Sequence, residues 1–404
     1  MTRRSFDILG DIPGDGTGYP RRASFHDIQA LPVLLPPGPD IVLGADVLRG
    51  FSLQIDFSAR ALTFWSGQRA PDSFLGAAQC SGTIDAPACF ALLHFNLIGG
   101  GELTAVSEPD FLGLTGPVEF SASRLLLRAC AAPAPADPRG GADQQPSCCT
   151  RSAAVTFPSA TSVEQLGYGP TGTDLSLVVA TGLGPTVLSA STWTKIASNW
   201  SKIPGVDPLP EPAAGPPLYF PALPDPVTDV TWAELPRIAL VDLESDSTTD
   251  PGACVELARS RRLEWVERRR AEGKPYCPQL CDMDTREPTK AQNAAGYLER
   301  AGGLTVAIVP DGASVLQAVR TELRQQGPQV DGFLGTEALA STRMEIDYGA
   351  NPARVVFSCA PGSDRATCLA SPRCPRQASP SDLHSCFGLP PLRAEAACAL
   401  SGCS

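Results

Sequence analysis

Few residues in this chain have the types and spacings that catalysis or metal binding needs. Histidine occurs only three times, and no H-E-x-x-H, paired C-x-x-C or H-x-H spacing is present, so a zinc site is not expected. The sequence also contains no G-x-S-x-G nucleophile elbow and no Walker-type glycine loop. His384-Ser385-Cys386 lies in a cysteine-rich tail, and we interpret this triplet as incidental. We expect neither a metal nor a cofactor.

Cysteine is the reactive residue that the chain does contain in quantity. Its fourteen cysteines indicate an oxidising compartment, in which disulfides persist. Cys80 and Cys89 bracket a short stretch that a disulfide could close, and Cys254 could pair with Cys277 or Cys281. The cysteines expected in disulfides are Cys80, Cys89, Cys254, Cys277, Cys281, Cys359, Cys368, Cys374, Cys386, Cys398 and Cys403.

The composition narrows the class of protein. The chain has 404 residues, and its 37 glycines and 40 prolines exceed the usual combined share of about 12%, which favours a turn-rich, strand-dominated fold. A hydrophobic content of 43% is enough for a core and excludes wholesale disorder. The net charge of -11 argues against a nucleic-acid partner. No apolar run reaches the roughly 18 residues that a membrane-spanning helix needs.

Short apolar segments separated by glycine and proline predict strands. Residues 53–57 alternate apolar and polar side chains, as a half-buried strand does. Further strands are expected at 41–43, 62–65, 124–128, 175–180 and 237–243. Residues 131–150 are expected to form an exposed loop, and one helix is expected at 252–272, with Asp250-Pro251 at its start and Gly273 after its end.

The most informative feature is an internal repeat between a segment that begins at Ile41 and one that begins at Gly332. The two segments align with an offset of 291 residues, and a two-residue insertion before the last pair keeps them in step. The aligned pairs are Leu43 with Leu334, Gly44 with Gly335, Asp46 with Glu337, Leu48 with Leu339, Leu53 with Met344, Ile55 with Ile346, Asp56 with Asp347, Phe57 with Tyr348 and Phe64 with Phe357. An offset of this size is too long for a solenoid and suits duplicated lobes.

The repeated unit resembles the second half of a lobe in the pepsin-like and retropepsin-like aspartic proteases. In that family two apolar residues and a glycine cross beside the catalytic loop, and here Leu43-Gly44 and Leu334-Gly335 would be these cleft-supporting elements. The resemblance implies a mainly β, bilobal fold. It also implies an Asp-Thr-Gly or Asp-Ser-Gly in each lobe, because catalysis needs two carboxylates that share one proton.

The chain contains no Asp-Thr-Gly and no Asp-Ser-Gly. In the second lobe the matching context is an apolar strand that runs into Ala180-Thr181-Gly182, which resembles the catalytic loop with alanine in place of aspartate. A methyl group cannot hold or transfer a proton. Asp311-Gly312 retains an aspartate but lies only 24 residues before Gly335, and we interpret it as a turn. Asp15-Gly16-Thr17-Gly18 has no apolar strand before it and is also expected to be a turn.

The repeat gives the domain organisation that we expect. Residues 1–79 would be the second half of an N-terminal lobe, 80–358 a C-terminal lobe with insertions, and 359–404 a cysteine-rich tail. Only 43 residues precede Gly44, and the N-terminus lacks the apolar core of a signal peptide. Either the thiols are reduced or metal-bound in a cytosolic protein, or the chain lacks its true N-terminus. The second explanation is favoured, and it makes an extracytoplasmic location the expectation.

Two functions of different classes follow from the resemblance. The first is an inactive relative of the aspartic proteases that binds an extended peptide or protein, or serves as a structural protein, outside the cytoplasm. The second is an acid endopeptidase in which a carboxylate from elsewhere in the chain, or from a partner chain, completes the catalytic pair.

Overall fold

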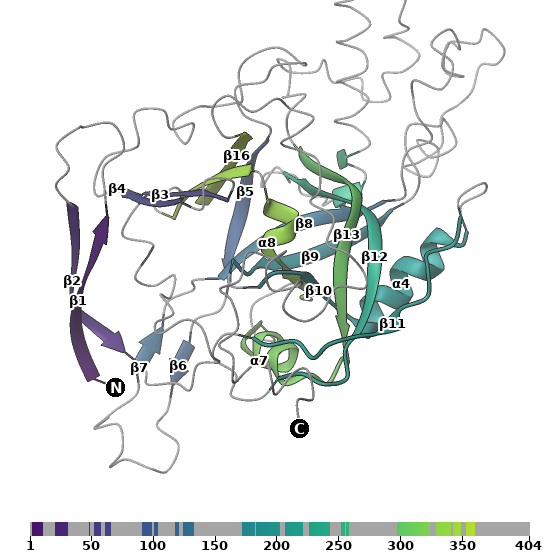
Figure 1. The fold of residues 1–404 in the computed structure, drawn as a ribbon, viewed down its shortest axis with the longest axis horizontal. Coiled ribbons are helices and arrows are strands. Elements are labelled where there is room, and N and C mark those ends of the chain that lie inside the picture. The colour runs from purple at the N-terminus through teal and green to yellow at the C-terminus, as the bar shows by residue number, and fades with distance from the viewer. Residues whose placement is uncertain are drawn as a thin grey trace, which may run out of the picture.

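The structure is a computed structural model, and it describes residues 2–10, 21–30, 48, 52–57, 61–65, 91–98, 101–103, 118–120, 124–132, 172–181, 183–202, 207–220, 226–242, 252–254, 256–257, 297–323, 329–340, 342–348 and 353–359. Its described part is mainly β, as the composition predicts (Figure 1). The strands are β1 (Thr2–Gly10), β2 (Arg21–Ala30), β3 (Ser52–Asp56), β4 (Ala61–Trp65), β5 (Ala91–Ile98), β6 (Gly101–Leu103), β7 (Val118–Phe120), β8 (Arg124–Ala131), β9 (Thr173–Val179), β10 (Thr186–Ser189), β11 (Ala213–Ala214), β12 (Thr231–Val241), β13 (Tyr297–Val309), β14 (Gly332–Leu334), β15 (Thr342–Asp347) and β16 (Ala353–Cys359). The helices are α4 (Ala190–Trp200), α7 (Ser314–Leu323) and α8 (Thr336–Leu339).

Six strands close into a barrel. Neighbouring strands pair in the order β8, β9, β14, β10, β13 and β12, and β12 returns to pair with β8. Two of these contacts are parallel, between β9 and β14 and between β10 and β13, whereas the other four are antiparallel. The closed ring leaves no open edge within these six strands.

The barrel strands have apolar side chains on both faces, which explains their nearly unbroken hydrophobic sequences. Leu175 and Leu177 of β9 belong to one core cluster, whereas Val178 belongs to another. The first cluster includes Trp193, Ile196 and Trp200 of α4, and the second includes Leu316 and Val319 of α7. Because successive side chains of a strand point to opposite faces, each helix covers a different side of the barrel sheet.

A second group of strands continues the same sheet away from the barrel. β5 pairs with β8 through residues 96–98 and with β16 through residues 91–95, and the order then runs through β15 and β3 to β4. Figure 1 shows β5 running between the barrel and these outer strands. The pairs β1–β2 and β6–β7 form two separate two-stranded sheets.

The registers of the outer strands agree with the alignment of the repeat. In one hairpin Leu53 of β3 lies opposite Phe64 of β4, and in the other Met344 of β15 lies opposite Phe357 of β16. In the repeat Leu53 aligns with Met344, and Phe64 aligns with Phe357 after the two-residue insertion. The repeat is therefore present in the structure as two β-hairpins with equivalent registers.

The sequence predicted the strands better than it predicted the helices. The strands expected at 53–57, 62–65, 124–128, 175–180 and 237–243 correspond to β3, β4, β8, β9 and the end of β12. Helices α4 and α7 were not expected, although Trp193, Ile196 and Trp200 recur at helical spacing after the N-cap residue Ser189. Of the helix expected at 252–272 only the start is described, and Glu256 N–H there donates to the Gly252 carbonyl at 3.2 Å.

Several other expectations concern segments outside the described residues. These are the strand at 41–43 with Leu43 and Gly44, the turn at 15–18, the loop at 131–150 beyond residue 132, and the tail from residue 360.

Candidate functional site

The loop that resembles the catalytic loop follows directly after β9. The backbone N–H of Ala180 donates to the Leu334 carbonyl at 3.0 Å, and the Ala180 carbonyl accepts the N–H of Leu183 at 3.0 Å. Ala180 is half-buried and Thr181 is exposed, while Gly182 lies outside the described residues. The loop therefore turns back on itself at Ala180 and is tied to β14 by its backbone.

β14 crosses between the two strands that flank this loop. It runs parallel to β9 and antiparallel to β10, so Gly332–Leu334 separates two strands that are close neighbours in sequence. The crossing brings Leu334 and Gly335, predicted as the apolar residue and glycine of the repeat, against the Ala180 loop. This juxtaposition joins residues about 155 positions apart in the sequence.

Glycine is required at the point of closest approach. A Cβ atom at Gly335 would collide with the backbone of Pro185 and would lie 2.6 Å from the Gly184 carbonyl oxygen. Its φ is -84°, so the requirement comes from space and not from a left-handed backbone. The loop and the start of α8 are thus in direct backbone contact.

The start of α8 hydrogen-bonds to the carbonyl groups of the loop. Thr336 donates its N–H to the Leu183 carbonyl at 2.8 Å and its hydroxyl to the same oxygen at 2.9 Å. Glu337 donates its N–H to the Gly184 carbonyl at 2.9 Å. Helix N–H groups that would otherwise lack partners are therefore satisfied by the loop.

Glu337 is the carboxylic acid that the fold places behind the loop. Its side chain is buried, and Oε1 accepts the Thr305 N–H at 3.3 Å. The pKa of Glu337 is raised to about 7, mainly by burial; the nearby carboxylate of Glu234 contributes to the rise, and the hydrogen bonds from Thr305 oppose it. Because the residue is only 4% exposed, it is a buried support and not a group that a substrate could reach.

A buried arginine supports α8 from β13. Arg300 is 1% exposed, and its Nε donates to the Ala338 carbonyl at 2.7 Å. Burial lowers the pKa of Arg300 to about 10. Hydrogen bonds at the start of α8 therefore link this short helix to the loop, and a hydrogen bond near its end links it to β13.

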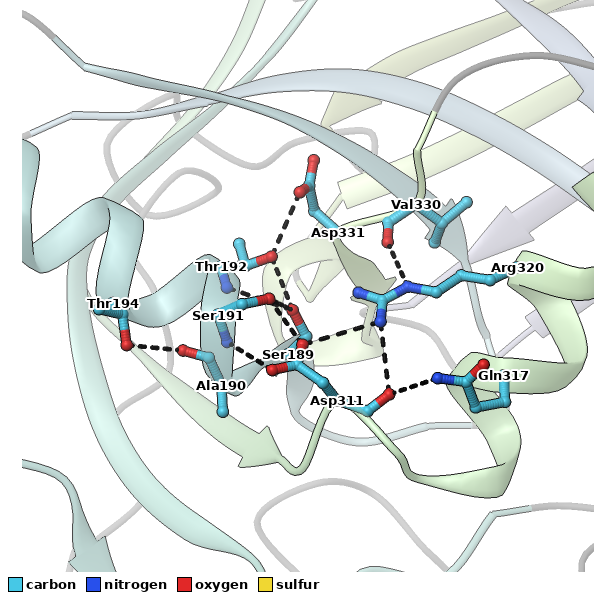
Figure 2. Close-up of polar contacts among 10 residues, drawn as sticks. All are labelled: Ser189, Ala190, Ser191, Thr192, Thr194, Asp311, Gln317, Arg320, Val330 and Asp331. Atoms are coloured by element: carbon cyan, nitrogen blue, oxygen red, sulfur yellow. Dashed lines mark hydrogen bonds and ion pairs between the residues drawn. The ribbon is translucent and has the colours of Figure 1, made fainter. Parts of the chain in front are cut away.

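A second polar cluster lies around the start of α4, where β10 ends and β14 begins (Figure 2). The predicted turn at Asp311-Gly312 is confirmed, and the Pro310 carbonyl accepts the Ala313 N–H at 2.9 Å. Asp311 accepts the Ser191 hydroxyl at 2.6 Å and the Ser191 N–H at 3.2 Å. The Ser191 hydroxyl is the main cause that lowers the pKa of Asp311; hydrogen bonding to Ser189 and the charge of Arg320 add to it, and desolvation opposes it.

The remaining members of this cluster join it to the strands. Asp331, directly before β14, accepts the Ser176 N–H at 2.8 Å and the Thr192 hydroxyl at 3.2 Å. Ser189 caps α4 by accepting the Thr192 N–H at 3.2 Å. The cluster thus caps a helix and fixes the start of β14, and Asp311 serves this structural role.

The disulfide at Cys254 differs from the prediction. Cys254 is bonded to Cys130 of β8, 124 residues away, and not to Cys277 or Cys281. Asp174, which lies opposite Cys130 in the sheet, accepts the Cys254 N–H at 2.7 Å and so brings the two cysteines together. At Gly172 a Cβ atom would lie 2.5 Å from one sulfur and 2.6 Å from the other, so this glycine leaves room for the bond.

The other predicted disulfide cysteines are described only in part. Cys359 is disulfide-bonded. The predicted disulfide cysteines that lie outside the described residues are Cys80, Cys89, Cys277, Cys281, Cys368, Cys374, Cys386, Cys398 and Cys403.

Two further observations bear on the kind of site. Within the described residues, no group of three or more His, Cys, Asp or Glu side chains could hold a metal ion. In the same part of the chain, none of the helices has the length and apolar character to span a membrane.

Comparisons with known proteins do not identify a family: no protein-family model, no curated protein and no solved structure matches this chain.

Proposed function

We propose that this chain is an aspartic-protease-like protein that is catalytically inactive and acts as an extracytoplasmic peptide-binding or structural protein. The observation that carries the proposal is the crossing of β14 between β9 and β10, which packs Leu334 and Gly335 against the loop at Ala180. The loop resembles the catalytic loop of that family in its strand context and in its Thr-Gly sequence. Alanine stands where the family has its aspartate.

The chemistry of the family supports inactivity. A pair of carboxylates activates a water molecule and protonates the leaving amine, and each carboxylate depends on the other for its pKa. Ala180 has no ionisable group, and Glu337, an acid in the short helix that contacts the loop, is buried and hydrogen-bonded to Thr305. We infer that peptides bind at the exposed side of the loop, where Thr181 lies, and are not cleaved.

The repeat supports a two-lobed arrangement. The two copies form hairpins β3–β4 and β15–β16, and the hairpins are joined by antiparallel pairing of β3 with β15. An extended peptide would then lie between the lobes and add its backbone to a strand, the mode in which hydrogen bonds of the peptide backbone supply much of the affinity. The Cys130–Cys254 disulfide suits an oxidising location.

Hydrolysis of a peptide library at acidic pH, with and without an aspartic-protease inhibitor, tests this function. We expect no inhibitor-sensitive cleavage by the unmodified protein, as measured by mass spectrometry of the products. Inhibitor-sensitive turnover would instead favour the alternative, an aspartic-type endopeptidase whose carboxylate comes from elsewhere in the chain or from a partner chain.

The variants Ala180→Asp and Ala180→Asn test whether residue 180 occupies the position of a catalytic aspartate. Both add a side chain of similar size, but only aspartate can share a proton with another carboxyl group. We expect the inhibitor to bind Ala180→Asp more tightly than Ala180→Asn in calorimetric titrations at acidic pH. Equal binding by the two variants would contradict the assignment of Ala180 to the catalytic position.

A further inference from the structure

The segment between α4 and β12 is rich in proline. Residues 207–217 contain five prolines, and from 207 to 212 every residue either is a proline or directly precedes one. Proline fixes its own φ at about −65° and restricts the residue before it to extended conformations. The next two residues, Ala213 and Ala214, form the short strand β11 and are extended as well. The sequence itself therefore keeps this segment in an extended, polyproline II-like conformation.

One face of the segment rests on the protein, and the residues of this face recur at every third position. Leu209 packs against the core cluster that contains the tryptophans of α4, and Pro212 is half-buried. A Cβ atom at Gly215 would collide with the indole ring of Trp232, and Leu218 is buried. A polyproline II helix has about three residues per turn, so residues at this spacing share a face. The other two faces are turned outward, and residues 207, 208, 210, 211, 213 and 214 are all exposed.

Hydrogen bonds to the strand beside it fix the segment in place. β11 pairs with β12, with Ala213 opposite Trp232. Trp232 Nε1 donates to the Pro216 carbonyl at 3.1 Å. Leu218 and Val227 each donate their N–H to the other's carbonyl at 2.9 Å. A segment that is already fixed in an extended form loses little conformational entropy when a partner binds it.

The C-terminal end of the segment combines two prolines with an aromatic ring. Its sequence is Pro216-Pro217-Leu218-Tyr219, and both prolines are half-buried. Tyr219 is 36% exposed, although Leu218 before it and Phe220 after it are buried. The fold thus turns the third residue of this Pro-Pro-x-Tyr sequence inward and leaves the tyrosine ring at the surface, three positions after the first proline.

We propose that Pro216, Pro217 and Tyr219 form a docking surface for a partner protein that binds polyproline II segments in a groove lined by aromatic side chains. In this mode of recognition aromatic rings pack against prolines, and the partner profits from a ligand that is extended before it binds. A partner that adds a strand is not favoured, because proline has no N–H to donate to a neighbouring strand. The inference does not rest on the proposed function, because it uses no residue of the Ala180 loop.

The experiment uses the full chain and, as the probe, a WW domain that binds Pro-Pro-x-Tyr peptides in its aromatic groove. Calorimetric titration should show saturable binding of the probe to the unmodified protein. Tyr219→Ala and Pro217→Ala should each weaken this binding about tenfold or more, since each removes a side chain that enters the groove. The matched control is Pro210→Ala, which changes an exposed proline of the same segment outside the Pro-Pro-x-Tyr sequence. It should leave the affinity within about twofold of that of the unmodified protein.

A free peptide with the sequence of residues 212–220 is the reference, and circular dichroism checks that the variants are folded. The chain should bind the probe at least as tightly as the peptide does, because the fold has already fixed the extended conformation. Weaker binding by the chain than by the peptide would mean that the fold covers the motif, and would overturn the proposal. It is also overturned if neither binds, or if Tyr219→Ala and Pro210→Ala behave alike. A dimer of the unmodified chain that Tyr219→Ala dissociates would assign the surface to a second copy instead.

Discussion

Gln54 and Glu345 lie directly opposite each other in the antiparallel pair β3–β15, and they are also equivalent residues of the repeat, 291 positions apart. The Nε2 of Gln54 donates to the Oε1 of Glu345 at 3.4 Å, and Arg343 donates to the same oxygen at 3.0 Å. The flanking pairs are symmetric about Gln54 and Glu345: Ile55 lies opposite Met344, and Leu53 lies opposite Ile346. In the repeat Leu53 is equivalent to Met344 and Ile55 to Ile346. A local two-fold axis therefore passes between Gln54 and Glu345 and relates the two hairpins.

The first prediction concerns this axis. Gln54→Glu would place two carboxylates opposite each other, beside Arg343. We expect a loss of about 1 kcal/mol or more in the free energy of unfolding at neutral pH, and recovery at acidic pH as a carboxyl group is protonated. Urea denaturation between pH 4 and 8 measures this effect. Gln54→Met is the control, and a pH dependence no larger than that of the control would contradict the prediction.

The second prediction tests the close approach of α8 to the Ala180 loop. Gly335→Ala should lower the free energy of unfolding by about 2–4 kcal/mol, because the new methyl group collides with the backbone at Pro185. At Gly312 a Cβ atom would have no atom within 4 Å apart from those of Gly312 and its two neighbours in the chain, so Gly312→Ala should change stability by less than about 1 kcal/mol. Thermal and urea denaturation of both variants provide the comparison. Similar effects at the two glycines would show that the crossing is not closely packed.

The third prediction follows from the buried carboxyl group of Glu337. Its pKa is raised from 4.5 to about 7 in the folded state. At pH values between these two, Glu337 keeps its proton in the folded state but has lost it in the unfolded state. The contribution of protonated Glu337 to stability is complete below about pH 4.5 and is lost as the pH rises to about 7. We expect this loss to be roughly 3 kcal/mol.

Glu337→Gln should remove most of this pH dependence, because an amide keeps an acceptor for the Thr305 N–H without ionising. Denaturation curves from pH 4 to 8 test the expectation. The exposed residue Glu211 gives the control variant Glu211→Gln, which should keep the pH profile of the unmodified protein. If Glu337→Gln also keeps that profile, Glu337 is not the group responsible.

The fourth prediction concerns the disulfide. Removing the Cys130–Cys254 bond by the paired change of both residues to serine should cost about 2–5 kcal/mol of unfolding free energy. Peptide mapping without reduction should recover one fragment in which Cys130 and Cys254 are linked. A fragment that joins Cys254 to Cys277 or Cys281 would favour the pairing expected from sequence spacing.

The fifth prediction concerns the cap of α4. Asp311→Asn should lower the free energy of unfolding by about 0.5–1 kcal/mol at neutral pH, since the Ser191 hydroxyl and N–H lose a charged acceptor. The pKa of Asp311 is lowered in the folded state, so its contribution is present above the ordinary pKa of aspartate and is lost as the pH falls through the folded value. The difference between the variant and the unmodified protein should therefore shrink as the pH falls below the ordinary pKa of aspartate. A difference that stays constant with pH would mean that the charge of Asp311 has no part in the cap.

Local sequence patterns predicted much of the strand content. Alternation identified β3, because side chains of a strand point to its two faces in turn. Continuous apolar runs identified β8 and β9, because both faces of these strands are buried. The spacing of Trp193, Ile196 and Trp200 after Ser189 would also have identified α4. The repeat gave the equivalent registers of the two hairpins in advance, since a strand and the turn that follows it are encoded within a few neighbouring residues.

The sequence by itself therefore determined that the protein is mainly β, that it contains two copies of one hairpin, and that Ala180 stands in a loop without a carboxylate. Only the tertiary structure decided that β14 passes between β9 and β10, that Cys254 joins Cys130, and that Gln54 meets Glu345. These partners lie more than 100 residues apart, and each contact depends on which strands pair. Strand pairing over such distances is set by burial of the whole sheet and by loop closure, and no local pattern of residues encodes it.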